Sequence, residues 1–308
     1  MRVVAALGGN ALLERGERPD SDLQESHVAS AVGALEPLLD SHQVVITHGN
    51  GPQVGVLAVE SAADPALSRP YPFDVLGAQT QGMIGYWLIQ ALQGAAPGKP
   101  AVCLVCRTVV RAGDPAFDHP AKFVGPVYDK AAAVELAAAH GWDIREDGNA
   151  WRRVVPSPEP TGIVELETIR LLMRHGVIVV CSGGGGIPVV ADGTGGLRGV
   201  EAVVDKDLTA ALLAQALGAD ALLLLTDVEA VIDGYGQPGA RPIRRATTAE
   251  LRAMKFPAGS MGPKIEAACR FAEQTGAIAA IGRLDDAGPL LDGTAGTTIV
   301  PAEGKGRR

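Results

Sequence analysis

The stretch VVAALGG, residues 3–9, decides the fold of this chain. Its first five residues form a continuous apolar run, as expected for a strand of a parallel sheet that helices cover on both faces. The two glycines after the run allow a ligand to approach the backbone closely, and their amides can bind an anion. A strand that ends in such a turn predicts the first unit of an α/β protein, whose ligands lie beyond the carboxyl ends of the strands.

The same pattern recurs along the chain. Short apolar runs predict further strands at residues 44–47, 101–105, 177–181, 221–226 and 277–281. Amphipathic or alanine-rich stretches predict helices at residues 23–39, 75–93, 163–175, 208–217 and 263–275. This alternation predicts a largely parallel sheet between two layers of helices.

Residues 111–160 break the alternation. They contain six prolines and mix polar with aromatic residues. Because structureless loops of such length are rare in compact domains, we interpret the segment as an inserted lobe or lid. A peripheral hairpin is the alternative interpretation.

The composition narrows the classes of partner. Of 308 residues, 47% are hydrophobic, which is enough to bury a sizeable core. The formal charge of -8 argues against nucleic acid or an anionic membrane as the main partner, so any phosphate site must be local. The first apolar run is too short for a signal peptide, and Cys103 and Cys106 would face opposite sides of a strand. We therefore expect a cytoplasmic protein with buried thiols rather than a metal-binding cysteine pair.

Three glycine-containing turns are candidate ligand loops. They follow predicted strands and comprise residues 8–10, THGNGPQ at 47–53 and SGGGGIP at 182–188. Four consecutive glycines are conformationally costly, which indicates crowding of the backbone near a ligand, with a flexible hinge as the alternative. The usual phosphate-loop and protein-kinase glycine motifs are absent from the sequence.

Lysines at two predicted helix starts are candidates for phosphate binding. Lys206 and Asp207 lie in a first turn, where the helix dipole disfavours a lysine unless an anion lies beside it. The alternative is that Asp207 caps the helix and Lys206 is solvated. Lys264 follows a proline at another helix start, whose free amides can also bind phosphate. Arg152 and Arg153 either grip an anion or pair with acids near the lid.

Taken together, these motifs resemble those of the carbamate kinases of the amino acid kinase superfamily. The matching segments are ALGGNAL at 6–12, HGNGPQ at 48–53, RRVVPSP at 152–158, SGGGGIP at 182–188, DKD at 205–207 and GSMGPK at 259–264. The resemblance implies a three-layer αβα sandwich with a mainly parallel central sheet, a small protruding lid subdomain and a homodimer. It also implies reversible phosphoryl transfer between carbamoyl phosphate plus ADP and carbamate plus ATP, run toward ATP.

The resemblance further implies a division of the chain and of the site. Residues 1–215, with the lid at about 111–160, would bind carbamate or carbamoyl phosphate, and residues 216–308 would bind ATP or ADP. The implied catalytic residues are Lys122, Lys206, Asp207 and Lys264, with Lys122 delivered by the lid. The implied substrate-binding residues are Gly8, Gly9, Asn10, Gly49, Asn50 and Gly51. The implied nucleotide-binding residues are Asp227, Val228, Tyr235 and Met261.

Mg²⁺ is expected to arrive with the nucleotide, held by phosphates and water, so no dedicated protein metal site is predicted. Two segments depart from the pattern of the family. KFVGPVY at 122–128 replaces the usual KPIGPFY, and VEAVI at 228–232 replaces VD-x-VY. These departures affect the lid packing and the adenine contacts.

Two other functions compete. The first is a kinase of the same superfamily acting on another small acid, for which a lysine would stand directly before the first glycine pair. Leu7 occupies that position here, so Lys122 must supply the charge. The second is a nucleotide sensor without catalytic activity, for which the loss of Lys206, Asp207 or Lys264 would be the signal.

Overall fold

The computed structural model describes residues 1–9, 12–14, 16–256 and 261–302. In this part of the chain, the main sheet has eight strands in the order β15-β17-β16-β12-β1-β2-β9-β3. Their bounds are β1 (Arg2–Leu7), β2 (Gln43–His48), β3 (Ala101–Cys103), β9 (Ile178–Val180), β12 (Ala221–Thr226), β15 (Arg245–Thr247), β16 (Ile278–Arg283) and β17 (Thr297–Val300). The strands from β16 to β3 in this order run parallel, and β17 is antiparallel to β16. The mainly parallel central sheet is thus confirmed.

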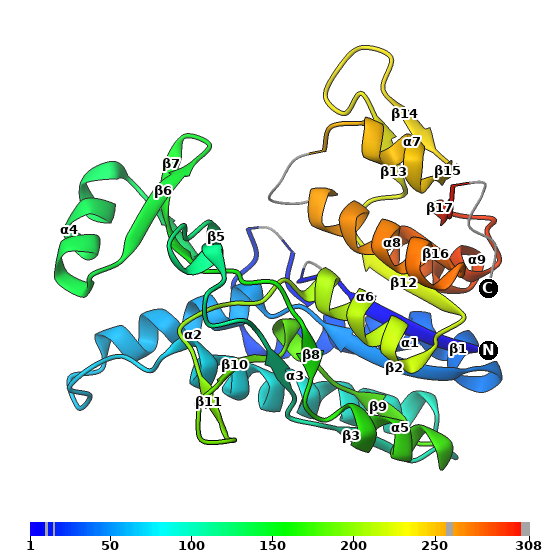
Figure 1. Cartoon of the computed structure of the whole chain (residues 1–308), viewed down its shortest axis with the longest axis horizontal. Coiled ribbons are helices and arrows are strands. Elements are labelled where there is room, and N and C mark those ends of the chain that lie inside the picture. Colours follow the sequence, from blue (N-terminus) through cyan, green and yellow to red (C-terminus); the bar gives the residue numbers. More distant parts are fainter. Residues whose placement is uncertain (10–11, 15, 257–260, 303–308) are drawn as a thin grey trace.

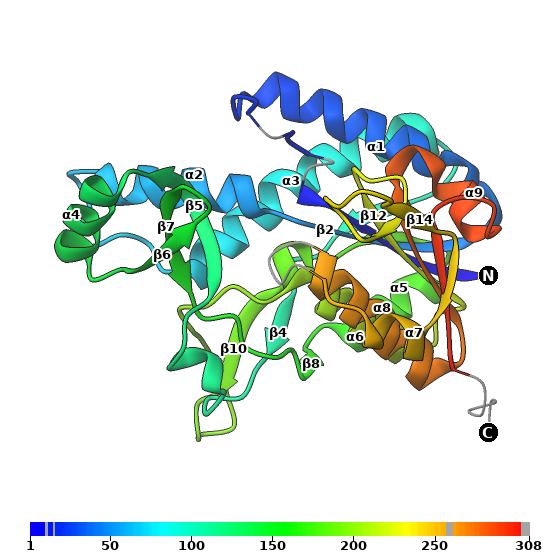
Figure 2. The same ribbon diagram turned by 90° about the horizontal axis from the view of Figure 1, so that it is seen from above.

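Helices cover both faces of this sheet (Figures 1 and 2). One face carries α1 (Ser21–Ser41), α3 (Phe73–Ala95) and α9 (Ala287–Leu291). The other carries α5 (Leu166–Arg174), α6 (Lys206–Leu217), α7 (Thr248–Ala253) and α8 (Met261–Thr275). Short helical turns η2 (Pro115–Phe117), η3 (Gly183–Gly185) and η4 (Leu284–Asp286) lie in the connections. This arrangement is the three-layer αβα sandwich.

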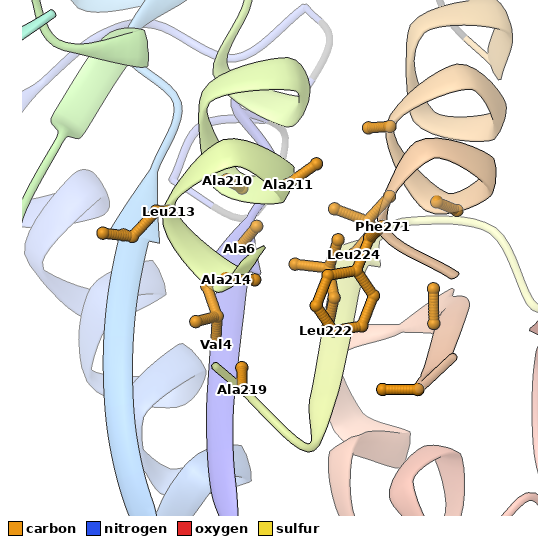
Figure 3. Close-up of a cluster of buried hydrophobic side chains, with 14 of the residues drawn as sticks. Val4, Ala6, Ala210, Ala211, Leu213, Ala214, Ala219, Leu222, Leu224 and Phe271 are labelled. Carbon is orange, nitrogen blue, oxygen red and sulfur yellow. The ribbon is translucent and has the colours of Figure 1, made fainter. Parts of the chain in front are cut away.

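The first strand shows why its apolar run is continuous. Val3, Ala5 and Leu7 pack on the α1 and α3 side, whereas Val4 and Ala6 pack on the α6 side. Figure 3 shows Val4 and Ala6 together with Leu222 and Leu224 of β12, beneath the alanines of α6. Small side chains on α6 allow that helix to lie close to the sheet.

Two smaller sheets lie beside the main one. The first has the order β11-β10-β4-β8 and consists of β4 (Arg107–Val109), β8 (Gly162–Ile163), β10 (Ile187–Ala191) and β11 (Leu197–Gly199). The second pairs β13 (Val231–Asp233) with β14 (Arg241–Ile243). Cys103 packs on the α1 and α3 side of the main sheet and Cys106 on the α5 and α6 side, as predicted. Cys106 lies beyond the end of β3, however, and Cys103 is only half-buried.

The segment that breaks the alternation forms a unit of its own. It contains β5 (Lys122–Tyr128), α4 (Lys130–His140), β6 (Asp143–Asp147) and β7 (Ala150–Val155), and its sheet order is β5-β7-β6. We call residues 122–155 the lid. It projects away from the main sheet, on the left in Figure 1. Three strands and a helix are more than a peripheral hairpin. The division into lobes at residue 215 stays a prediction, since one sheet runs through both parts.

The predicted strands and helices are present with bounds shifted by a few residues. Among the described residues, α4, α7 and α9 lie outside the predicted helix ranges, and so does one longer helix. This is α2 (Gly51–Ala63), which runs from the carboxyl end of β2 toward the lid. Its signals were Pro52 in the first helical turn and buried residues at helical spacing, including Val54, Ala58 and Ser61. These signals were overlooked because the glycines at the start of α2 are also typical of a turn. No helix in the described ranges is long and apolar enough to span a membrane.

Candidate active site

Two glycine turns meet at the carboxyl ends of β1 and β2. The amide of Gly8 donates to the Leu225 carbonyl at 2.8 Å, and that of Gly49 donates to the Leu7 carbonyl at 2.9 Å. A Cβ atom on Gly49 would lie 2.9 Å from the Gly9 amide nitrogen and 3.2 Å from Cδ of Lys206. Only glycine therefore fits at position 49, and its absent side chain lets the Lys206 stem pass beside both turns.

A buried ion cluster lies next to these turns. Lys206 donates to Oδ1 of Asp207 at 2.6 Å, and Lys264 donates to Oδ2 of the same carboxylate at 3.0 Å. The side chains are 14%, 13% and 5% exposed for Lys206, Lys264 and Asp207. Lys206 and Lys264 are 58 residues apart in the sequence. The first turns of α6 and α8 thus bring both lysines to one carboxylate.

The lid supplies a third lysine. Lys122, the first residue of β5, donates to Oδ2 of Asp205 at 2.7 Å. The other oxygen of Asp205 accepts from the amides of Asp207 and Leu208, so Asp205 caps α6. The sequence interpretation that Asp207 can serve as a cap is wrong, because both of its carboxylate oxygens accept from lysines. A residue directly before a helical pattern is the usual cap position, and this signal identifies Asp205.

The charges in this cluster do not balance among the described side chains. Burial alone would raise the pKa of Asp207, but the two ammonium groups outweigh burial and hold it well below its usual range. Burial lowers the pKa of Lys206, with Asp207 opposing and Lys264 reinforcing the shift. Lys122, Lys206 and Lys264 face two carboxylates. The cluster therefore carries one excess positive charge, which favours an anionic ligand.

The four-glycine loop, residues 183–186, packs against the second glycine turn. Gly184, Gly185 and Gly186 have positive φ angles, and a Cβ atom on Gly183 or Gly184 would collide with His48 or Asn50. The predicted crowding is thus present, and it comes from side chains of the chain itself. The loop acts as a platform under residues 48–50.

The two side chains that pack against this glycine platform, His48 and Asn50, have defined hydrogen-bond partners. Asn50 donates to Oγ1 of Thr80 at 2.8 Å, and Nδ1 of His48 lies 2.9 Å from the Gly49 carbonyl. Since a carbonyl only accepts, Nδ1 carries the proton. Burial lowers the pKa of His48 to about 4, with the Gly49 carbonyl opposing, so the imidazole is neutral near pH 7. Thr80 was missed by sequence reasoning because it lies inside the α3 pattern.

Two of the predicted nucleotide residues, Asp227 and Val228, directly follow β12, which ends beside the first glycine turn. A Cβ atom on Gly8 would lie 3.6 Å from Cα of Thr226, whose hydroxyl donates to Asp227 at 3.0 Å. Val228 follows and is half-buried. Met261 starts α8 and packs on the core, whereas Tyr235 is 76% exposed between β13 and β14.

The other positions singled out in the sequence lie on α2, in the lid or outside the described residues. Gly51 is the exposed first residue of α2. Asn10 lies outside the described residues, as do residues 259–260 of the GSMGPK motif. Arg152 and Arg153 pair with acids, Asp147 and Glu201 respectively, which decides between the two alternatives left open for them.

Comparison with known proteins agrees with this geometry. A sequence model described as the amino acid kinase family matches residues 1–281. The chain is 49% identical over 302 residues to a carbamate kinase of Rhizobium meliloti (strain 1021), covering 97% of this chain and 93% of the relative. It is 45% identical over 312 residues to a carbamate kinase of Pyrococcus horikoshii, covering 97% and 99%. The solved structure of carbamate kinase from Giardia lamblia bound to AMP-PNP superimposes with a TM-score of 0.89 at 40% identity, covering 98% of each chain.

Proposed function

The chain belongs to the amino acid kinase family, and we propose that it transfers a phosphoryl group between carbamoyl phosphate plus ADP and carbamate plus ATP. It is a phosphotransferase by its family and its relatives. The observation that carries the proposal is the meeting of Lys206, Lys264 and Asp207 beside the glycine turns, with Lys122 on the adjoining Asp205. The carbamate kinases at 45–49% identity support the substrate.

The three lysines would neutralise charge from two sides of the transferred group. We assign Lys206 and Lys264 to the phosphates of the nucleotide and Lys122 to the carbamoyl side. Phosphoryl transfer depends mainly on in-line positioning and on stabilising charge spread over the equatorial oxygens. The amides of the glycine turns at 8–9 and 49–51 would hold the small anion without adding side-chain bulk.

This reaction needs no general base. The attacking oxygen of carbamate is already anionic, whereas a sugar or alcohol acceptor has a proton to lose. Asp207 is a poor proton acceptor, because two ammonium groups occupy its oxygens and lower its pKa. His48 donates through Nδ1 to a backbone carbonyl and lies against the glycine platform. Both residues therefore position other groups.

The proposed direction of the reaction, toward ATP, is supported by the chemistry of carbamoyl phosphate as the phosphoryl donor. Carbamoyl phosphate is a mixed anhydride of two acids, and such anhydrides transfer phosphoryl groups readily to ADP. The homodimer and the cytoplasmic location stay predictions from the resemblance and from the composition.

Mg²⁺ is proposed to enter as part of the nucleotide substrate. The described residues contain no group of three or more His, Cys, Asp or Glu side chains that could hold a metal ion. Asp205 and Asp207, the carboxylates nearest the lysines, are already engaged by Lys122 and by Lys206 with Lys264. The described side chains thus do not fit a resident metal site, and phosphate and water would supply the ligands.

The direct test is ATP formation by the purified protein from ADP and carbamoyl phosphate. Acetyl phosphate serves as the comparison donor, because it shares the acyl phosphate bond but lacks the carbamoyl nitrogen. We expect kcat/KM to favour carbamoyl phosphate by at least about tenfold, equivalent to one or two differential contacts. Equal use of both donors, or no ATP from either, would contradict the proposal.

A further inference from the structure

Arg153 lies where the lid meets the body of the protein. It is on β7, and its guanidinium carbon lies 4.7 Å from the ring centre of Phe73 and 4.6 Å from that of Trp142. Its Nη2 atom donates to Glu201 at 3.2 Å. Trp142 belongs to the lid, whereas Phe73 and Glu201 belong to the body. One guanidinium thus contacts both parts.

The contacts on the body side are themselves anchored. Phe73 is the first residue of α3 and is 2% exposed. Its amide donates to the other oxygen of Glu201 at 2.8 Å. Glu201 therefore joins the start of α3 to Arg153, and neither partner of the guanidinium is a freely moving surface side chain.

The neighbouring arginine provides an internal contrast. Arg152 donates to the Gly125 carbonyl at 2.7 Å and to Asp147 at 3.3 Å, and both partners lie within the lid. Arg152 thus holds the lid strands to each other. Arg153 instead contacts both the lid and the body. Substitutions of Arg152 therefore test the folding of the lid, whereas substitutions of Arg153 test its placement on the body.

The chemistry of the Arg153 site requires a guanidinium. The side chain is 17% exposed, and burial lowers its pKa while the Glu201 carboxylate opposes that shift. A planar cation contacts aromatic rings favourably and still presents edge donors to a carboxylate. A lysine keeps the charge but lacks both the flat faces and the fork of donors.

Strand pairing links this contact to Lys122. In the ladder between β5 and β7, Arg153 pairs with Val124 and Val155 pairs with Lys122. Lys122 is therefore two residues along the partner strand from the position opposite Arg153. Close approach of α2 to β5 braces the same strand, since a Cβ atom on Gly55 would lie 2.8 Å from Cα of Gly125.

We propose that Arg153 is a positioning residue that orients the lid on Phe73 and Glu201 and thereby places Lys122 against Asp205 at the phosphoryl site. The inference rests on the proposed function for the role of Lys122 in using carbamoyl phosphate. The orientation itself follows from contacts that need no substrate, so the two ideas can fail separately.

The test is a double-mutant cycle between Arg153→Lys and Lys122→Ala, measured as kcat/KM for carbamoyl phosphate. Arg153→Lys alone should lower kcat/KM by about tenfold, because misplacing a charged group by about an ångström weakens its effect strongly. In a chain that already carries Lys122→Ala, the same change should cost less than about twofold. Additive losses would overturn the proposal.

Matched controls separate placement from folding. Arg152→Lys makes the same chemical change inside the lid and should keep kcat/KM within about threefold. In Glu201→Gln, the side-chain amide oxygen can still accept from the Phe73 amide, but the carboxylate partner of Arg153 is lost. This variant should show the same loss of kcat/KM as Arg153→Lys, and it keeps the test valid if Arg153→Lys folds poorly. Full activity in Glu201→Gln and Arg153→Lys would overturn the proposal.

Hydrogen exchange of the lid supplies a readout that does not depend on activity. Peptides covering residues 122–155 should exchange faster in Arg153→Lys than in the unmodified protein, while peptides from α1 stay unchanged. Unchanged lid exchange would contradict the docking role. If the unmodified protein made no ATP from carbamoyl phosphate but the exchange changed as expected, the proposed function would fail and the docking role would stand.

Discussion

Helix α8 takes part in two ion clusters that differ in burial and in balance. At its start, Lys264 joins Lys206 on Asp207, and these side chains are at most 14% exposed. Farther along, Glu266 pairs with Arg270 at 2.7 Å and with Arg252 at 2.8 Å, and these side chains are 36–41% exposed. Water therefore screens the second cluster much more than the first.

This difference in burial distinguishes charges that favour an anionic ligand from charges that only pair with each other. An exposed ion pair contributes little to stability, and an uncompensated charge beside it costs little. A buried excess of positive charge is costly unless an anion neutralises it. In the proposed function, the first turn of α8 therefore binds a phosphate, whereas the exposed pairs hold α8 against its neighbours. The predictions below test this contrast.

The largest expected effect comes from the buried lysines. Lys206→Ala and Lys264→Ala should each lower kcat by about a hundredfold or more, because each removes a charge aimed at the transferred group. Steady-state ATP formation from carbamoyl phosphate and ADP measures this. Near-normal turnover in either variant would contradict the distinction between the buried and the exposed ion cluster of α8.

Lys122→Ala should have the next largest effect, and on one substrate. The lysine comes from the lid and, in the proposed function, acts on the carbamoyl side, so the KM for carbamoyl phosphate should rise by about tenfold. The Kd for ADP, measured by calorimetry, should change by less than about twofold. A similar loss for both substrates would indicate that the change disturbs the whole site.

His48 should make stability depend on pH. Its pKa falls from 6.5 to about 4 on folding, so below pH 6.5 the unfolded chain binds a proton that the folded protein does not. The free energy of unfolding should therefore decrease as the pH falls from about 6.5 to about 4, by up to about 1.4 kcal/mol per pH unit. Denaturant titrations of the unmodified protein and of His48→Gln at pH 7 and pH 5 measure this contribution, which should be absent from the variant. Equal pH dependence in both proteins would contradict a buried neutral His48.

The smallest effect is expected in the exposed cluster. Arg270→Met should change the free energy of unfolding by about 0–1 kcal/mol, since its pairs with Glu266 and Glu159 are partly solvated. Turnover should stay within about twofold of the unmodified protein. A loss comparable to that of Lys264→Ala would show that both ion clusters of α8 act in catalysis.

Much of the fold was predictable from local pattern. The apolar runs identified the strands of the parallel core, and the glycine turns located their carboxyl ends, because both signals lie within a few residues of each other. The helix α2 was missed since its start, Gly51-Pro52, is also typical of a turn. The alternative that Asp207 caps α6 was wrong, because the cap position directly before the helical pattern belongs to Asp205.

The sequence by itself determined the layered fold, the glycine turns and the lysines available to a phosphate. Only the tertiary structure decided that Lys122, Lys206 and Lys264 gather around two neighbouring aspartates, and that Arg153 pairs with Glu201. The physical reason is range. Strand and turn formation depend on neighbouring residues, whereas the placement of buried charges depends on how distant segments pack and on the water they exclude.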